Sequence, residues 1–133
     1  MNGATVKVYS LAKDGNKQLS TNFRVREFAC KDGSDVIFIS DKLWRLAQAI
    51  RSHFGQPTYI NSAYRTPAYN KKVGGSAYSQ HLYGKAMDIV VEGVPPSMVA
   101  DYAETLMPNT GGIGRYKDFT HIDDRTVKSR WNG

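Results

Sequence analysis

Two histidines and an aspartate stand out as groups able to hold a metal ion. His81 and Asp88 lie seven positions apart in "SQHLYGKAMD", and His121 lies inside "THIDD". Neutral imidazole and carboxylate are the ligands that zinc accepts from a chain without paired cysteines. Three such ligands leave the fourth position of a tetrahedral site open, which is typical of a catalytic site. Spacing alone leaves two interpretations open: a zinc site, or histidines that only satisfy local polar contacts.

The third histidine and the single cysteine are weaker candidates for chemistry. His53 falls near the end of a predicted helix, where a cation also suits the helix dipole. Cys30 can form no internal disulfide and has no CxxC partner, so we expect it to be a small buried apolar residue.

Two segments with helical periodicity must help to position these groups. In "SDKLWRLAQAIRSHFG", Ser40 is expected as the N-cap and Gly55 as the stop, and the apolar residues fall on one stripe. "PPSMVADYAETLMPN" is a second helix, with Ser97 as the expected N-cap.

Short apolar runs indicate strands that carry the candidate ligands. "PTYINSAYR" alternates, "KAMDIVVEG" is typical of a buried strand, and "GGIGRY" and "FTHIDDR" are expected to pair through a turn at Lys117 and Asp118. Between the first two lies a Gly- and Tyr-rich connection, residues 66–84, and long loops in compact domains are often functional. A bend at Gly84 would bring His81 toward the strand that holds Asp88.

Length and composition predict one small α+β domain, an antiparallel sheet with helices packed on one side. The 133 residues suffice for a single core without disulfides. Residues 1–18 are polar and rich in turn formers, so we expect an extended N-terminal arm, followed by the domain at 19–133. We expect a monomer.

The charge balance favours anionic partners without naming one. The net charge is +6 and the pI is near 9.5, which suits a nucleic acid or an anionic cell wall. The basic residues are scattered, so binding of nucleic acid is not expected. The N-terminus lacks the apolar core of a secretory signal, and no apolar run approaches the roughly 20 residues needed to cross a bilayer. We therefore expect no membrane insertion, and a protein that stays in the cytoplasm until lysis or is released to the cell wall.

The full string "SQHLYGKAMD" matches SxHxxGxAxD and resembles the signature of the zinc D-Ala-D-Ala carboxypeptidases. Relatives of that family include the L-alanyl-D-glutamate endolysins of phages and the zinc-binding hedgehog signalling domain. The resemblance extends to "INSAYRTPAYN", to "GGIGRYKDFTHIDDR" and to "LSTNFRVREFACKDG", the last being similar to the short single-domain branch. It covers roughly residues 19–131.

The resemblance implies a role for each matching residue. It makes His81, Asp88 and His121 the ligands of one zinc ion, and Arg65 the group that faces the scissile carbonyl or the substrate carboxylate. A guanidinium is suited to both tasks because it is planar and always charged. Residues near the first ligand would orient it or touch substrate: Ser79, Gln80 and Tyr83.

The general base has two candidates. Relatives commonly place an acidic residue three positions before the last ligand, and here that position is Asp118, which we favour. Relatives with a histidine two positions before that ligand do not match, because Phe119 stands there. Asp123 is the rival, since on a regular strand it shares a face with His121. It is also a candidate to pair with Arg125.

The resemblance implies zinc-dependent hydrolysis of the peptide stems of peptidoglycan, by a D-Ala-D-Ala carboxypeptidase or a related endopeptidase. A phage or prophage lysis enzyme is a plausible setting. A non-catalytic zinc-binding module of the same fold is the first alternative, and a basic nucleic-acid-binding protein is the second. Five tyrosines are candidates to line a cleft, although packing is the commoner role: Tyr64, Tyr69, Tyr78, Tyr83 and Tyr116.

Overall fold

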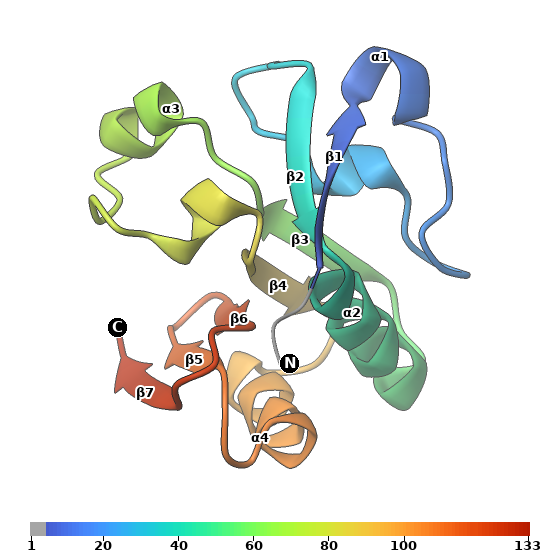
Figure 1. Ribbon diagram of the computed structural model, residues 1–133. Coiled ribbons are helices and arrows are strands. Elements are labelled where there is room, and N and C mark those ends of the chain that lie inside the picture. Colours follow the sequence, from blue (N-terminus) through green and yellow to red (C-terminus); the bar gives the residue numbers. More distant parts are fainter. Residues whose placement is uncertain (1–4) are drawn as a thin grey trace.

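The structure is a computed structural model that describes residues 5–133. Two sheets organise the fold (Figure 1). The larger sheet has five strands in the order β3-β4-β6-β5-β7, and the smaller one pairs β1 with β2. The strands are β1 (Val6–Ser10), β2 (Val36–Ser40), β3 (Thr58–Ser62), β4 (Ala86–Val91), β5 (Gly112–Arg115), β6 (Thr120–Asp123) and β7 (Ser129–Asn132). The helices are α1 (Leu11–Asp14), α2 (Asp41–Phe54), α3 (Pro67–Lys72) and α4 (Pro96–Leu106), with 3₁₀ turns η1 (Val25–Phe28) and η2 (Gln80–Tyr83).

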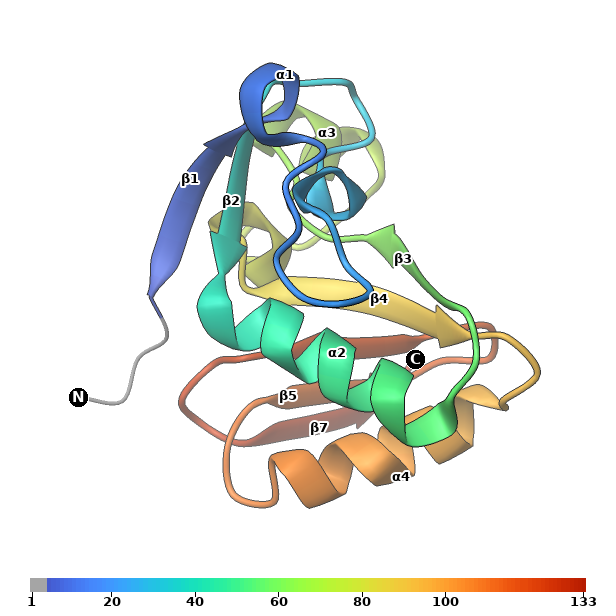
Figure 2. The same cartoon turned by 90° about the vertical axis from the view of Figure 1, so that its right-hand side faces the viewer.

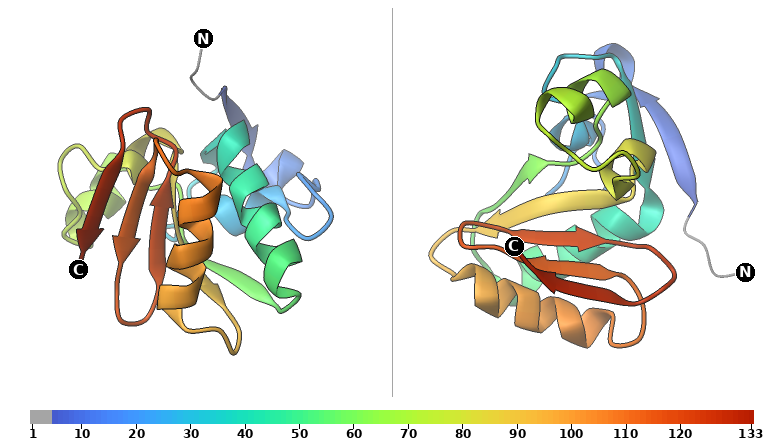
Figure 3. Two further views of the ribbon diagram at one scale, coloured as in Figure 1. Left: turned by 90° about the horizontal axis from the view of Figure 1, so that it is seen from below. Right: turned by 90° about the vertical axis from the view of Figure 1, so that its left-hand side faces the viewer.

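Helices α2 and α4 cover one face of the large sheet (Figure 2). The stripe predicted for α2 is buried: Leu43, Leu46, Ala47 and Ile50. Figure 3 shows α3 and η2 on the other side of the sheet, away from α2 and α4. The α+β prediction with the two long helices on one side of the sheet is therefore confirmed, and the opposite face is left for a site.

The sheet departs from the prediction at its edge. All its pairs are antiparallel except β5–β7, which is parallel. The sequence did not indicate β7, because four residues with a single apolar side chain give no periodic signal. The predicted hairpin of β5 and β6 is confirmed, with a turn closed by a hydrogen bond from the Tyr116 amide to the Phe119 carbonyl, 3.2 Å.

Two predicted helix starts need correction. Helix α4 begins at Pro96 with Pro95 as its cap, so Ser97 lies inside the first turn. Proline suits this position because its fixed φ matches the helix and its missing N–H has no partner there in any case. Ser40 stands at the N-cap position of α2, but its hydroxyl makes no hydrogen bond to the first turn of the helix and donates to Asp124 instead.

The segment predicted as an extended arm contains regular structure. Strand β1 pairs with β2 from Val6↔Ser40 to Ser10↔Val36, and α1 follows it directly. Residues 1–4 of that arm lie outside the described residues. Strand β2 was not expected, and neither was α3, which begins at Pro67 after Thr66 accepts a hydrogen bond from the Tyr69 amide. None of the helices within residues 5–133 has the length and apolarity needed to cross a membrane.

Gly84 makes the bend between η2 and β4 that the sequence predicted. Its φ of +71° lies in the left-handed region, and its amide closes η2 on the Gln80 and His81 carbonyls. A Cβ at this position would overlap the Phe38 carbonyl, and the Gly84 carbonyl accepts from the Ser40 amide at 2.8 Å. Glycine is thus required both by the backbone angle and by the close approach of β2.

We expect Gly84→Ala to lower the free energy of unfolding by about 3 kcal/mol, since strain at positive φ adds to overlap with backbone. Gly93→Ala is the matched control, because Gly93 has a φ of +73° but a methyl group added to it would meet no atom within 4 Å. Its expected loss is about 1 kcal/mol. Urea unfolding measures both variants, and equal losses would show that the Phe38 contact has no effect.

Candidate metal centre

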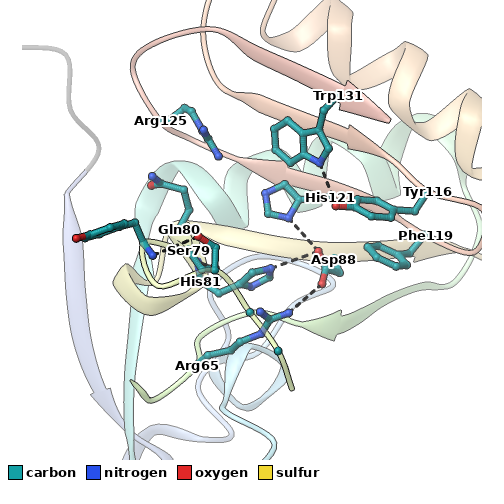
Figure 4. Close-up of a pocket in the computed structure, with 14 residues that line it drawn as sticks. Arg65, Ser79, Gln80, His81, Asp88, Tyr116, Phe119, His121, Arg125 and Trp131 are labelled. Carbon is teal, nitrogen blue, oxygen red and sulfur yellow. Dashed lines mark hydrogen bonds and ion pairs between the residues drawn. The ribbon is translucent and has the colours of Figure 1, made fainter. Parts of the chain in front are cut away.

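The sheet register brings two of the three candidate ligands together. Asp88 on β4 and His121 on β6 are directly opposite each other, so their side chains share one face. His81 lies on η2 and reaches the same point after the bend at Gly84, as Figure 4 shows. These three residues therefore come from two neighbouring strands and the loop that enters one of them.

The donor atoms of the three residues form a compact, buried group. One ligand atom from each of His81, Asp88 and His121 lies within 4.8 Å of the others. Asp88 Oδ1 is 3.3 Å from His81 Nε2 and 3.1 Å from His121 Nδ1. The residues are only 3%, 8% and 9% exposed, respectively. Among residues 5–133 they are the one group of His, Cys, Asp and Glu with this geometry.

Hydrogen bonds on the far side of each ring fix the histidine tautomers. His81 Nδ1 lies 2.6 Å from the Ala63 carbonyl, which can only accept, so Nδ1 carries the proton and Nε2 offers a lone pair. His121 Nε2 lies 2.8 Å from Asp123 Oδ2 and donates to it, which leaves His121 Nδ1 as the lone pair. Two oriented neutral imidazoles and a carboxylate fit a zinc ion with an open position.

The electrostatics of the group favour a cation. Burial alone would raise the pKa of Asp88, but the two imidazoles that face it, His121 and His81, donate to its carboxylate when they are protonated in the ion-free protein, and they hold that pKa well below its usual range. Burial would lower the pKa of His121, yet the carboxylates of Asp123 and Asp88 outweigh it and raise that pKa above its ordinary value. The low pKa keeps Asp88 ionised, and the raised pKa of His121 shows that the two carboxylates beside it favour positive charge at this centre.

Asp123 is fully buried and its oxygens are all engaged. Oδ1 accepts from the Gly112 amide at 3.0 Å, from the Arg125 amide at 3.2 Å and from Arg125 Nε at 2.8 Å. Oδ2 accepts from Arg125 Nη2 at 2.7 Å and from His121 Nε2 at 2.8 Å. Burial would raise the pKa of Asp123, but these bonds from His121 and Arg125 hold it well below its usual range. Asp123 does not belong to the lining of the cavity in which the three candidate ligands lie.

Arg65 stands beside the group, as the resemblance implied. Its Nη2 lies 3.6 Å from Asp88 Oδ2, the oxygen that does not face the histidines. The guanidinium is held by Ser62 Oγ at 3.2 Å and by Asn70 Oδ1 at 3.1 Å. A Cβ at Gly75 would overlap Asn70, so the glycine lets the loop pack closely over this pair. Arg65 is thereby held with one edge toward the cavity.

The donor group lies in a cavity of about 470 Å³. Two arginines, Arg65 and Arg125, belong to its lining. Ser79 and Gln80 line it too, and the Ser79 hydroxyl accepts from the His81 amide at 3.1 Å, which positions the first ligand. The predicted substrate contact Tyr83 is half exposed and lies outside the cavity lining.

Asp118, the favoured base, does not line the cavity. It lies at the tip of the β5–β6 turn with its side chain exposed, while Tyr116 and Phe119 on either side turn inward. The turn thus directs its two central residues to solvent. Among the described residues, Asp88 is the only carboxylate in the cavity lining. The role of Asp118 stays a prediction that requires this turn to change its conformation.

Sequence reasoning missed part of the cavity wall. Phe119 and Trp131 line it, and of the five tyrosines only Tyr78 and Tyr116 do. Trp131 is delivered by the unexpected strand β7, so no local signal could place it. Arg125 was predicted only as the partner of Asp123, a pairing that is present, and its place in the cavity was not foreseen.

The small α+β domain thus carries, in an open cavity, a buried His/Asp/His group of the kind that can hold a metal ion. A model of the family described as Peptidase M15 matches residues 18–123. The chain therefore belongs to the peptidase M15 family, and the resemblance inferred from the sequence is confirmed. None of the curated proteins compared with the chain matches it.

Proposed function

We propose that the protein is a zinc-dependent peptidase that hydrolyses the peptide stems of bacterial peptidoglycan, as a D-Ala-D-Ala carboxypeptidase or a related endopeptidase. The observation that carries this proposal is the donor group of His81, Asp88 and His121 beside Arg65 in one cavity. The net charge of +6 supports it, because a basic protein is attracted to an anionic wall. The protein would act as a monomer, on the cell wall, after lysis or release.

The chain's own residues would bind and orient the substrate. A zinc ion held by the three ligands would supply Lewis-acid polarisation of the scissile carbonyl and acidify a water molecule. Arg65 presents a fixed guanidinium edge that binds a substrate carboxylate or steadies negative charge on the carbonyl oxygen. Ser79 keeps His81 in place through its hydrogen bond to the backbone amide.

The proposal is tested by zinc content and by hydrolysis of purified muropeptides. The parent is expected to bind one zinc ion and to release products whose masses identify the bond that is cut. His81→Ala is expected to lose both properties. It removes an imidazole whose Nε2 lone pair is already directed at the metal site by the hydrogen bond that Nδ1 makes. A parent protein that binds no zinc would exclude the metallopeptidase function altogether.

We propose Asp118 as the proton acceptor, brought to the cavity by a rearrangement of the Lys117–Asp118 tip of the β5–β6 turn that leaves Tyr116 and Phe119 in place. Asp118→Ala is then expected to lower kcat about 100-fold with the zinc content unchanged, as removal of a general base does. Asp101→Ala is the control, since Asp101 is an exposed carboxylate on α4 outside the cavity. Full activity of Asp118→Ala would exclude this assignment.

A non-catalytic zinc-binding module of the same fold is the second candidate. The exposed position of Asp118 favours it, because the cavity lining then holds no carboxylate free to accept a proton. The two functions differ in one result. A protein that binds zinc tightly and cleaves no muropeptide would support the module.

A further inference from the structure

The hydroxyl of Tyr116 has a proton with no partner. Trp131 Nε1 lies 3.0 Å from Tyr116 Oη. An indole N–H can only donate, so the tyrosine oxygen accepts and its own proton must point elsewhere. Among the hydrogen bonds of residues 5–133, none is donated by the Tyr116 hydroxyl. The hydrogen bond from the indole therefore occupies the Tyr116 oxygen as an acceptor and leaves the O–H of Tyr116 available as a donor.

Both rings are held in place by their neighbours. Tyr116 stacks on Phe119 with ring centroids 4.5 Å apart and an interplanar angle of 11°. Trp131 lies against Gly114, where a Cβ would come within 2.6 Å of the indole, so only glycine admits the ring. The Arg125 guanidinium lies 5.3 Å from the centroid of the Trp131 ring. The donor is consequently part of a rigid wall, which is the condition for preorganised hydrogen bonding.

This wall borders the metal centre. Tyr116, Trp131 and the three ligands line the same cavity, and the Trp131 ring centroid is 5.1 Å from that of His121. In Figure 4 the Tyr116 hydroxyl points toward His121, whereas Arg65 approaches Asp88 from the opposite side. A substrate carbonyl bound in this cavity beside the three residues would thus have a guanidinium on one side and a phenol on the other.

We propose that Tyr116 is a catalytic residue that donates a hydrogen bond to the scissile carbonyl oxygen as it becomes an oxyanion, and that Trp131 is its positioning residue. The inference rests on the proposed peptidase function. The phenol keeps its proton throughout, so it stabilises charge and does not replace the base. A neutral donor is suited to this place, since the nearby ligands already carry the negative charge of Asp88.

The test compares Tyr116→Phe with the parent in the zinc-loaded protein on muropeptides. The variant keeps the stack on Phe119 and loses only the hydroxyl. We expect kcat to fall about 100-fold with KM within about twofold, because the bond forms only in the transition state. Zinc content should not change. Tyr59→Phe, an exposed tyrosine on β3 outside the cavity, is the matched control and should behave as the parent does.

Trp131→Phe tests the positioning role, since it keeps an aromatic ring and removes the indole N–H. We expect kcat to fall about tenfold, with no further loss in the double variant with Tyr116→Phe. Independent losses that multiply in the double variant would show that Trp131 does not act through Tyr116.

A second probe separates this inference from the choice of substrate. A phosphinic D-Ala-D-Ala analogue, which mimics the tetrahedral oxyanion, should bind Tyr116→Phe at least tenfold more weakly than the parent. If the parent cleaves no muropeptide while this difference in binding is seen, the substrate is wrong and the role of Tyr116 holds. Equal analogue binding, or kcat within twofold of the parent, would overturn the role of Tyr116.

Discussion

Replacing Asp88 by alanine is expected to remove bound zinc and with it all detectable peptidase activity. Its Oδ1 lies between His81 Nε2 and His121 Nδ1, so the variant loses the ligand that stands between the other two. The two imidazoles that remain are neutral, and a site without its anionic ligand offers zinc no charge compensation. We expect zinc affinity to fall by at least about 1000-fold, given the large share of binding free energy that each ligand supplies.

Metal analysis and competition with a chelator measure the change in zinc affinity. Asp101→Ala removes a carboxylate from the exposed surface and should leave zinc binding as it is in the parent. The thermal transition gives an independent readout. Zinc should raise the Tm of the parent, because an ion that binds only the folded state stabilises it, and should leave the Tm of Asp88→Ala unchanged. Zinc binding by Asp88→Ala equal to that of the parent would contradict the ligand assignment.

The donor group was predictable because the signals for it are local. "SQHLYGKAMD" contains two of the three candidate ligands and the glycine that bends the chain, and the apolar run "IVV" of β4 follows it directly. The strands that hold Asp88 and His121 were both visible in the sequence, but β4 and β6 are not consecutive, so only the family resemblance indicated that these two residues meet. The helices that pack on the opposite face of the sheet were visible too, α2 through its apolar stripe.

The rest of the cavity depends on contacts between distant parts of the chain. Trp131 enters it because β7 pairs in parallel with β5, an edge arrangement that no local pattern in "SRWN" reports. Asp118 was expected to approach the centre because it precedes the last ligand by three residues. The turn instead points it to solvent, since its backbone, not its spacing, decides the direction of the side chain. Spacing therefore located the residues of the donor group but not the other residues that line the cavity.

Asp123→Asn is expected to damage the metal centre through His121, without removing a ligand. The parent carboxylate accepts five hydrogen bonds and donates none. An amide has one oxygen, which can serve the three donors at the Oδ1 position. Its NH₂ group would then face His121 Nε2, and the two donors would repel unless the imidazole changes its tautomer. The change moves the proton to Nδ1, the atom that faces Asp88.

We therefore expect Asp123→Asn to weaken zinc binding about 100-fold. This is the upper end of the range for removing the hydrogen-bond partner of a histidine that binds a metal. The free energy of unfolding should fall by about 3 kcal/mol, because a buried ion pair is broken. Asp101→Asn is the matched control, as it breaks an exposed pair with Arg115 and should cost at most about 1 kcal/mol.

Nitrogen-15 NMR of the imidazole groups in the zinc-free protein distinguishes a change of tautomer from simple loss of stability. At a pH above the raised pKa of His121, where the imidazole carries one proton, the parent should show that proton on Nε2, where it donates to Asp123, and the variant should show it on Nδ1. Destabilisation without this change would make Asp123 a structural anchor only. An unchanged tautomer together with unchanged zinc affinity would refute its action on the ligand. If the tautomer changes and zinc affinity falls with it, then Asp123 and Arg125 set the direction of the His121 lone pair, and the metal centre extends one hydrogen bond beyond its ligands.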